Sequence, residues 1–198
     1  MELLNLQKTH FLPNNEVKFE NKLDYLKFSE KLCRIHNSER FRTYVYDALP
    51  YQRDPPQNYD SNHFAEKQKF KVYLDSLPSF LTRYGACMLV PNKKCQMHMQ
   101  GKLSRPCEHI TQKGVDVRFS IDLVSLATDK RIDKAILITG DSDFIPAISY
   151  AREVNMKVFL YYYEGGSTFA HKGLRFGCDD RFLFTPSIFE DVLLSRSS

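Results

Sequence analysis

The sequence predicts one domain of the α/β class, built around a mostly parallel sheet, and three observations support this. Segments with helical spacing of apolar residues alternate with strand-like segments from residue 21 to residue 163. Residues 135–163 give a strand, a helix and a strand in succession, and such a unit has parallel strands joined by a right-handed crossover. The first of these strands runs into a glycine turn with two carboxylates, the edge where open parallel sheets bind ligands.

The first half of the chain predicts two helices, each followed by a strand. Residues Asn21–Ile35 place apolar side chains at helical spacing, and Phe41–Tyr46 carries the β-branched and aromatic residues typical of a strand. After a polar, proline-containing loop, Asn62–Ser76 predicts a second helix and Phe80–Val90 a second strand. Residues 91–112 predict an irregular basic loop that contains Cys and His.

The second half predicts the β-α-β unit and the end of the domain. A helix is predicted over 115–128, with Val117, Ile121 and Val124 as its buried stripe. A strand over 135–139, a helix over 143–154 and a strand over 157–163 follow, then a loop from residue 165 and a short strand and closing helix within 181–194. The domain therefore covers residues 1–194, and 195–198 form a tail.

Composition sets limits on partners and location. The 198 residues include 28 Lys plus Arg and 24 Asp plus Glu, and this net charge of +4 permits nucleic-acid binding without requiring it. No run of about 18 apolar residues is present, and the start lacks the pattern of a signal peptide, so we expect a cytoplasmic location and no membrane association. Five cysteines, an odd number, indicate free thiols rather than a disulfide framework.

Two carboxylates, Asp141 and Asp143, follow the strand 135–139 directly and are the first candidate site residues. Paired hard oxygen ligands at this edge suit Mg²⁺ or Mn²⁺ acting on phosphate. The alternative is that Asp143 or Ser142 caps the next helix. Since two Asp residues after Gly140 exceed what one cap requires, one carboxylate is free to face the crevice while the other caps.

The preceding helix brings two further acids. Asp122 is a candidate metal ligand. The alternative role for its carboxylate is a surface salt bridge with Arg118. Asp116 lies about 240° around the helix from Asp122, so it must occupy the first turn if both side chains face one site. The alternative role for Asp116 is to cap this helix. Carboxylates that converge repel each other unless a divalent cation neutralises them. For phosphodiester hydrolysis that ion would orient and activate a water molecule.

The loop 91–112 also holds four soft ligands, Cys95, His98, Cys107 and His109. Such residues form zinc sites, but the second pair is separated by a single residue, which departs from the usual spacing. We favour a loop with incidental Cys and His over a Zn²⁺ site.

Three segments together resemble the NYN (LabA-like) family, a branch of the PIN-like nucleases: Gln112–Val117, Ile121–Val124 and Thr139–Phe144, with Tyr46–Tyr51 as a further match. The resemblance covers roughly residues 20–165. It implies a three-layer α/β/α PIN-like fold with a central, mostly parallel sheet, and a Mg²⁺- or Mn²⁺-dependent endoribonuclease site.

Position by position, the resemblance assigns roles to the acids. Asp122, Asp141 and Asp143 match acidic metal-binding positions and are the catalytic candidates, and Asp116 matches the acid of the Lys-Gly-Val-Asp motif. Lys113 would lie near substrate phosphate. Ser142 and Arg118 are the other candidates for substrate contact in this region.

The chain departs from the family at its start. The family opens with a buried strand ending in Ile-Asp-Gly-x-Asn, and here that first strand is missing or atypical. The nearest match, residues 2–6, places Glu2 on the metal-binding Asp and Asn5 on the Asn. A missing central strand would expose the edges of its neighbours, and we expect that such an edge favours pairing, for example in a homodimer.

Two functions follow from the sequence. The first is a metal-dependent ribonuclease acting on single-stranded or structured RNA. The second is a catalytically degenerate module of the same fold that binds RNA or a protein. A phosphatase acting on small phosphoesters ranks third, because no Asp-x-Asp nucleophile ends a first strand.

Overall fold

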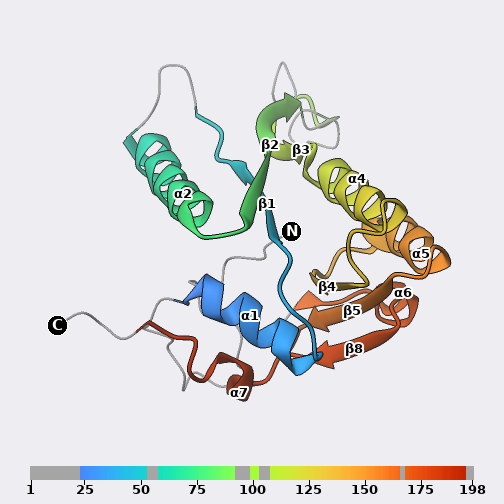
Figure 1. Cartoon of the computed structure of the whole chain (residues 1–198). Helices are drawn as coiled ribbons and strands as arrows, with labels where there is room; N and C mark the ends of the chain where they lie inside the picture. The colour runs from blue at the N-terminus through green and yellow to red at the C-terminus, as the bar shows by residue number, and fades with distance from the viewer. Residues whose placement is uncertain (1–22, 53–57, 92–98, 103–107, 166–167, 195–198) are drawn as a thin grey trace.

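The computed structural model describes residues 23–52, 58–91, 99–102, 108–165 and 168–194, and it confirms the α/β fold class (Figure 1). The helices are α1 (Tyr25–Ile35), α2 (Asn58–Ser76), α4 (Val115–Thr128), α5 (Ile145–Glu153), α6 (Lys172–Gly177), α7 (Pro186–Phe189) and the 3₁₀ turn η2 (Ser142–Phe144). The strands are β1 (Thr43–Leu49), β2 (Phe80–Pro91), β3 (Glu108–Lys113), β4 (Lys134–Ile138), β5 (Lys157–Tyr162), β6 (Glu164–Gly165), β7 (Thr168–Phe169) and β8 (Asp180–Leu183).

The strands form two three-stranded sheets and a small hairpin. In the first sheet, of order β1-β2-β3, β1 and β2 are parallel and β3 is antiparallel to β2. In the second sheet, β4, β5 and β8 are all parallel. Within the part of the chain that the structure describes, β1 and β4 each lie at an edge of their sheet.

Two hydrophobic cores lie on opposite faces of the strands and produce the three layers. Successive residues of a strand point to opposite faces, and in β4 Ala135 and Leu137 join one core while Ile136 and Ile138 pack against the other. Helices α4, α5 and α6 supply side chains to the first core, and α1, α2 and α7 lie with the second (Figure 1).

Most predicted elements are confirmed, and three local expectations are wrong. The segment 91–112, expected to be irregular throughout, ends in β3, which pairs with β2. The loop expected from residue 165 contains the β6-β7 hairpin and helix α6. Helix α2 begins at Asn58, four residues before the expected start at Asn62.

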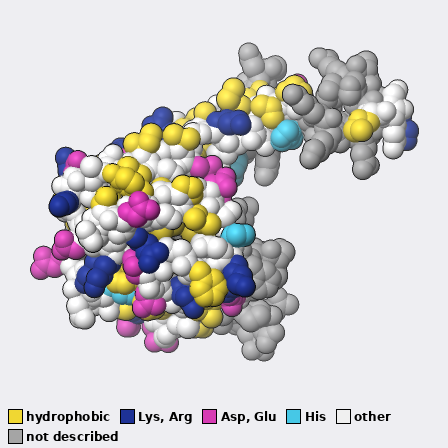
Figure 2. All heavy atoms as spheres, turned by 90° about the vertical axis from the view of Figure 1, so that its right-hand side faces the viewer, with side chains coloured by type: hydrophobic (Ala, Val, Ile, Leu, Met, Phe, Trp, Pro, Cys, Tyr) yellow, Lys and Arg dark blue, Asp and Glu magenta, His cyan; other side chains and the backbone are white. Residues whose placement is uncertain are grey.

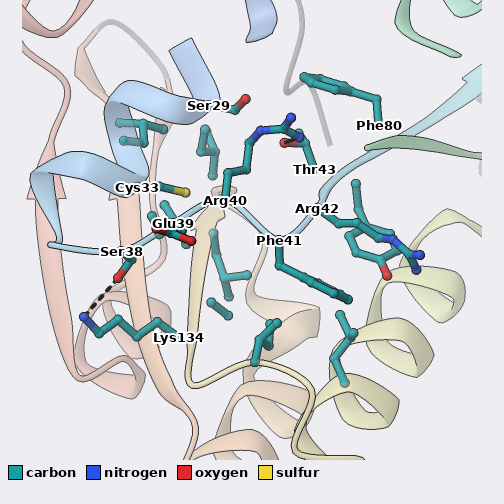
Figure 3. A pocket seen from close by; sticks show the side chains of 18 of the residues that line it. Ser29, Cys33, Ser38, Glu39, Arg40, Phe41, Arg42, Thr43, Phe80 and Lys134 are labelled. Carbon is teal, nitrogen blue, oxygen red and sulfur yellow. Dashed lines mark hydrogen bonds between the residues drawn. The ribbon is translucent and has the colours of Figure 1, made fainter. Parts of the chain in front are cut away.

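The predicted buried stripe of α4 is also wrong. Val117 is 61% exposed and Ile121 is 58% exposed, and only Val124 of the three is partly buried. The helix instead buries Val115, Phe119, Leu123 and Ala127. Figure 2, which looks onto the side of the molecule where α4 and α5 lie, shows hydrophobic side chains at this surface among acidic and basic ones.

At the start of the described chain, Leu23 forms a β-bridge with Leu193, and the carboxylate of Asp24 caps α1 by accepting from the Lys27 N–H at 3.0 Å. From residue 23 onward, the first strand is β1. Glu2 and Asn5 lie outside the described residues. None of the described helices has the length and apolar character needed to cross a membrane.

Candidate functional site

The turn after β4 carries the first pair of predicted site residues. Asp141 caps η2, because its Oδ1 accepts a hydrogen bond from the Asp143 N–H at 2.9 Å. The buried Thr139 fixes the other side of the turn, since its Oγ1 accepts from the Asp141 N–H at 3.1 Å. Asp141 is half-buried and Asp143 is exposed. Of the two residues expected as alternative caps, neither Ser142 nor Asp143 plays that role, and Asp143 is left facing solvent.

The turn is anchored by the residue that follows it. Phe144 is fully buried, and its ring lies 4.1 Å from the ring of Phe119 on α4, centroid to centroid. Pro146 then occupies the first turn of α5, where a missing N–H costs no hydrogen bond. The two carboxylates therefore sit on a short, rigidly attached turn beyond the carboxyl end of a parallel strand.

Asp122 is held by partners that the sequence analysis missed. Its Oδ2 accepts from the Tyr46 hydroxyl at 2.9 Å and from Arg83 Nε at 3.1 Å. The expected alternative, a salt bridge with Arg118, is replaced by this ion pair with Arg83, in which the Asp122 side chain is 21% exposed. Burial, and then the Asp122 charge, raise the pKa of Tyr46 well above its usual range, so the phenol remains a hydrogen-bond donor.

Lys113 and Asp116 lie on either side of Gly114, the residue that precedes α4. Gly114 precedes α4 with φ of 81°, a left-handed conformation that glycine adopts without steric cost. Asp116 occupies the first turn of α4, as the sequence required, where the helix dipole favours an acid; the helix has no side-chain cap bond. Lys113, Asp116 and Arg118 are all exposed.

Gly85 on β2 makes this arrangement possible. A Cβ atom added there would lie 2.6 Å from Val115 Cγ2 and closer still to the Lys113 carbonyl oxygen. Only glycine lets β2 pass so near the junction of β3 and α4. A lone glycine inside a predicted strand was the sequence signal for this close approach.

The predicted ligands do not form a complete protein cage. Among the residues that the structure describes, no group of three or more His, Cys, Asp or Glu side chains is placed to hold a metal ion. Mg²⁺, however, is commonly held by one or two carboxylates together with water and substrate phosphate. The half-buried Asp141 and the exposed Asp143 fit that mode of binding, whereas Asp122 is already paired with a cation.

Three of the four expected zinc ligands, Cys95, His98 and Cys107, lie outside the described residues. The fourth, His109, is exposed on β3. The preference for incidental Cys and His in this segment therefore stays a prediction.

Comparison with known proteins gives one match. A sequence model of the NYN domain family matches residues 8–186. The comparisons with curated proteins and with solved structures each found no match.

Proposed function

The chain belongs to the NYN domain family, and from this membership we propose that it is a metal-dependent endoribonuclease that hydrolyses phosphodiester bonds in RNA. The family match supports a PIN-like nuclease. The observation that carries the proposal is the pair Asp141 and Asp143, which lie on an anchored, accessible turn beyond the carboxyl end of β4.

In the proposed mechanism, the carboxylates of Asp141 and Asp143 would hold a Mg²⁺ or Mn²⁺ ion next to the phosphate of the RNA. When bound, the ion supplies positive charge that stabilises the phosphate during attack by water. The buried Phe144 and the hydroxyl of Thr139 keep the two carboxylates in one orientation before substrate arrives.

The exposed start of α4 completes the proposed site. Asp116 lies in its first turn, and because no three acids of the described residues are grouped to hold an ion, the ion is left to Asp141 and Asp143. Lys113 and Arg118 are exposed cations of the same region and would contact backbone phosphates, with Ser142 as a neutral donor on the turn after β4. Such contacts release counterions, so RNA affinity should fall with salt concentration.

Cleavage of a labelled single-stranded RNA tests the proposal, with Mn²⁺, Mg²⁺ or EDTA present. We expect cleavage that requires the metal and that falls at least 100-fold in Asp141→Asn and in Asp143→Asn. Asp133→Asn is the matched control, because Asp133 is an exposed carboxylate just before the opposite end of the same strand. Metal-dependent cleavage retained in Asp141→Asn and Asp143→Asn would refute the assignment.

The second candidate function is RNA or protein binding without cleavage by the same fold. It is favoured by the state of Asp122, whose charge is balanced by Arg83 and which is therefore held as a structural group. Binding of the same RNA with no cleavage under any metal condition, by a protein with intact circular dichroism, would establish this function in place of the nuclease.

A further inference from the structure

Helix α4 presents an apolar stripe to solvent, on the side of the molecule that Figure 2 looks onto. Val117 is 61% exposed and Ile121 is 58% exposed. The partly buried Val124 and the exposed Thr128 continue the line, because all four positions fall within about 60° of one another at 100° per residue. Their spacings of four, three and four residues are those of the seam between two coiled helices.

The stripe extends onto α5 through Tyr150. The Tyr150 hydroxyl lies 3.2 Å from Thr128 Oγ1, and Tyr150 is 38% exposed. Single exposed apolar residues are ordinary, but a continuous exposed patch of them marks a contact surface. We call these five residues the α4 stripe: Val117, Ile121, Val124, Thr128 and Tyr150.

The chemistry of the α4 stripe favours a protein partner. Its valine and isoleucine side chains offer neither hydrogen bonds nor the aromatic faces on which bases stack. The opposite face of α4 is already covered by the protein core, through Phe119 and Leu123. A helix that is apolar on two faces is typical of a helix covered on both.

Two charged residues border the stripe on one side. Arg118 and Asp129 lie about 60° and 80° around the helix from Ile121, in the direction away from Val117 and Val124. Asp129 is the C-cap and keeps helical dihedral angles, so the same spacing applies to it. Both residues are exposed. The border of the stripe therefore carries a cation at one end of the helix and an anion at the other.

The stripe is complementary to itself when two α4 helices lie antiparallel about a two-fold axis. Val117 of one copy then faces Thr128 of the second copy. Ile121 faces Val124 of the second copy about the same centre, which lies between residues 122 and 123. An isologous contact of this kind repeats each pair twice and closes after two subunits.

The charged borders match in the same arrangement. A two-fold axis perpendicular to both helices keeps the two borders on one side of the seam, so Arg118 lies beside Asp129 of the second copy. The centre of this pair is one residue from the centre of the apolar pairs, a shift of about 1.5 Å. A parallel pair would instead set Arg118 against the apolar side of the second helix.

We propose that a second copy of this chain docks on the α4 stripe, with the two α4 helices antiparallel. Charge complementarity selects a second copy as the occupant, because each copy supplies the anion that the other copy's Arg118 meets. Asp129 already pairs with Arg131 at 3.2 Å, but a carboxylate accepts from more than one donor. The five donors of Arg118 likewise allow contact with a phosphate as well.

Sedimentation velocity of the full chain, over a hundredfold range of concentration, tests the proposal. A single helix pair is a small interface, so we expect monomer at the low end and dimer at the high end. Ile121→Glu places a carboxylate in the apolar seam and should raise the dimer dissociation constant at least tenfold. Val72→Glu is the matched control, because Val72 is 68% exposed on α2, and it should leave the constant unchanged.

A charge exchange tests the antiparallel arrangement itself. Arg118→Asp sets like charges against each other at both ends of the interface, and so does Asp129→Arg, so each should weaken the dimer at least threefold. The double variant restores both pairs and should recover the parent constant. Folding is not at risk, because an acid near the start of a helix and a cation at its end suit the helix dipole.

Each result bears on the proposal. Sedimentation as a monomer throughout the range would overturn it and leave the stripe to a partner of different sequence. A dimer that Ile121→Glu leaves intact, or that Val72→Glu weakens equally, would also overturn it. Failure of the double charge variant to recover a dimer that both single variants lose would overturn the antiparallel pairing.

Discussion

Gly85→Ala tests how closely the sheet packs beneath the candidate site. The added methyl carbon would lie 2.6 Å from Val115 Cγ2, about 1 Å inside ordinary carbon–carbon contact, and also against the backbone oxygen of Lys113. Neither neighbour yields easily, because Val115 is 1% exposed and the oxygen belongs to the junction of β3 and α4. Overpacking of this kind costs about 1–3 kcal/mol, which lowers the melting temperature by about 2–12 °C in a chain of this size.

Urea unfolding followed by circular dichroism, together with a thermal melt, measures the effect of Gly85→Ala. Gly177→Ala is the matched control, because nothing lies within 4 Å of a Cβ atom added at Gly177, the last residue of α6. The control should change the free energy of unfolding by less than about 0.5 kcal/mol. A Gly85→Ala protein as stable as the parent would show that the junction of β3 and α4 is packed less tightly than described. The placement of Lys113 and Asp116 on either side of that junction would then be wrong as well.

Two further predictions concern the buried Tyr46 and the partly buried His36. Tyr46→Phe removes the hydroxyl that donates to Asp122 and should cost about 1–2 kcal/mol in urea unfolding, because Arg83 still pairs with the carboxylate; an unchanged midpoint would contradict this contact. Burial, and then the charge of a neighbouring lysine, lower the pKa of His36, so the unfolded chain binds the proton more tightly than the folded one. The stability that neutral His36 contributes is therefore complete above its unfolded pKa of about 6.5, and it is lost as pH falls through its pKa in the folded protein. Unfolding curves between pH 7 and pH 5 should show this loss in the parent and less of it in His36→Gln. The control variant His109→Gln should follow the parent.

Local patterns were enough to predict most of the helices and strands. The strand, the glycine and the paired acids at 135–143 lie within nine residues, so the sequence itself shows that Asp141 and Asp143 follow directly after a strand. The stripe of α4 failed for a physical reason: the helix carries apolar residues on more than one face, and periodicity cannot say which face packs inward. Phe119 decides it, because its ring contacts both Tyr46 and Phe144.

The partners of Asp122 were beyond such patterns. Tyr46 and Arg83 are separated from Asp122 by 76 and 39 residues, so the contact depends on which strands lie beside α4. Strand β3 was missed because its residues are polar and mostly exposed, and it owes its conformation to pairing with β2 rather than to burial of side chains. Both errors come from tertiary contacts that override local preference.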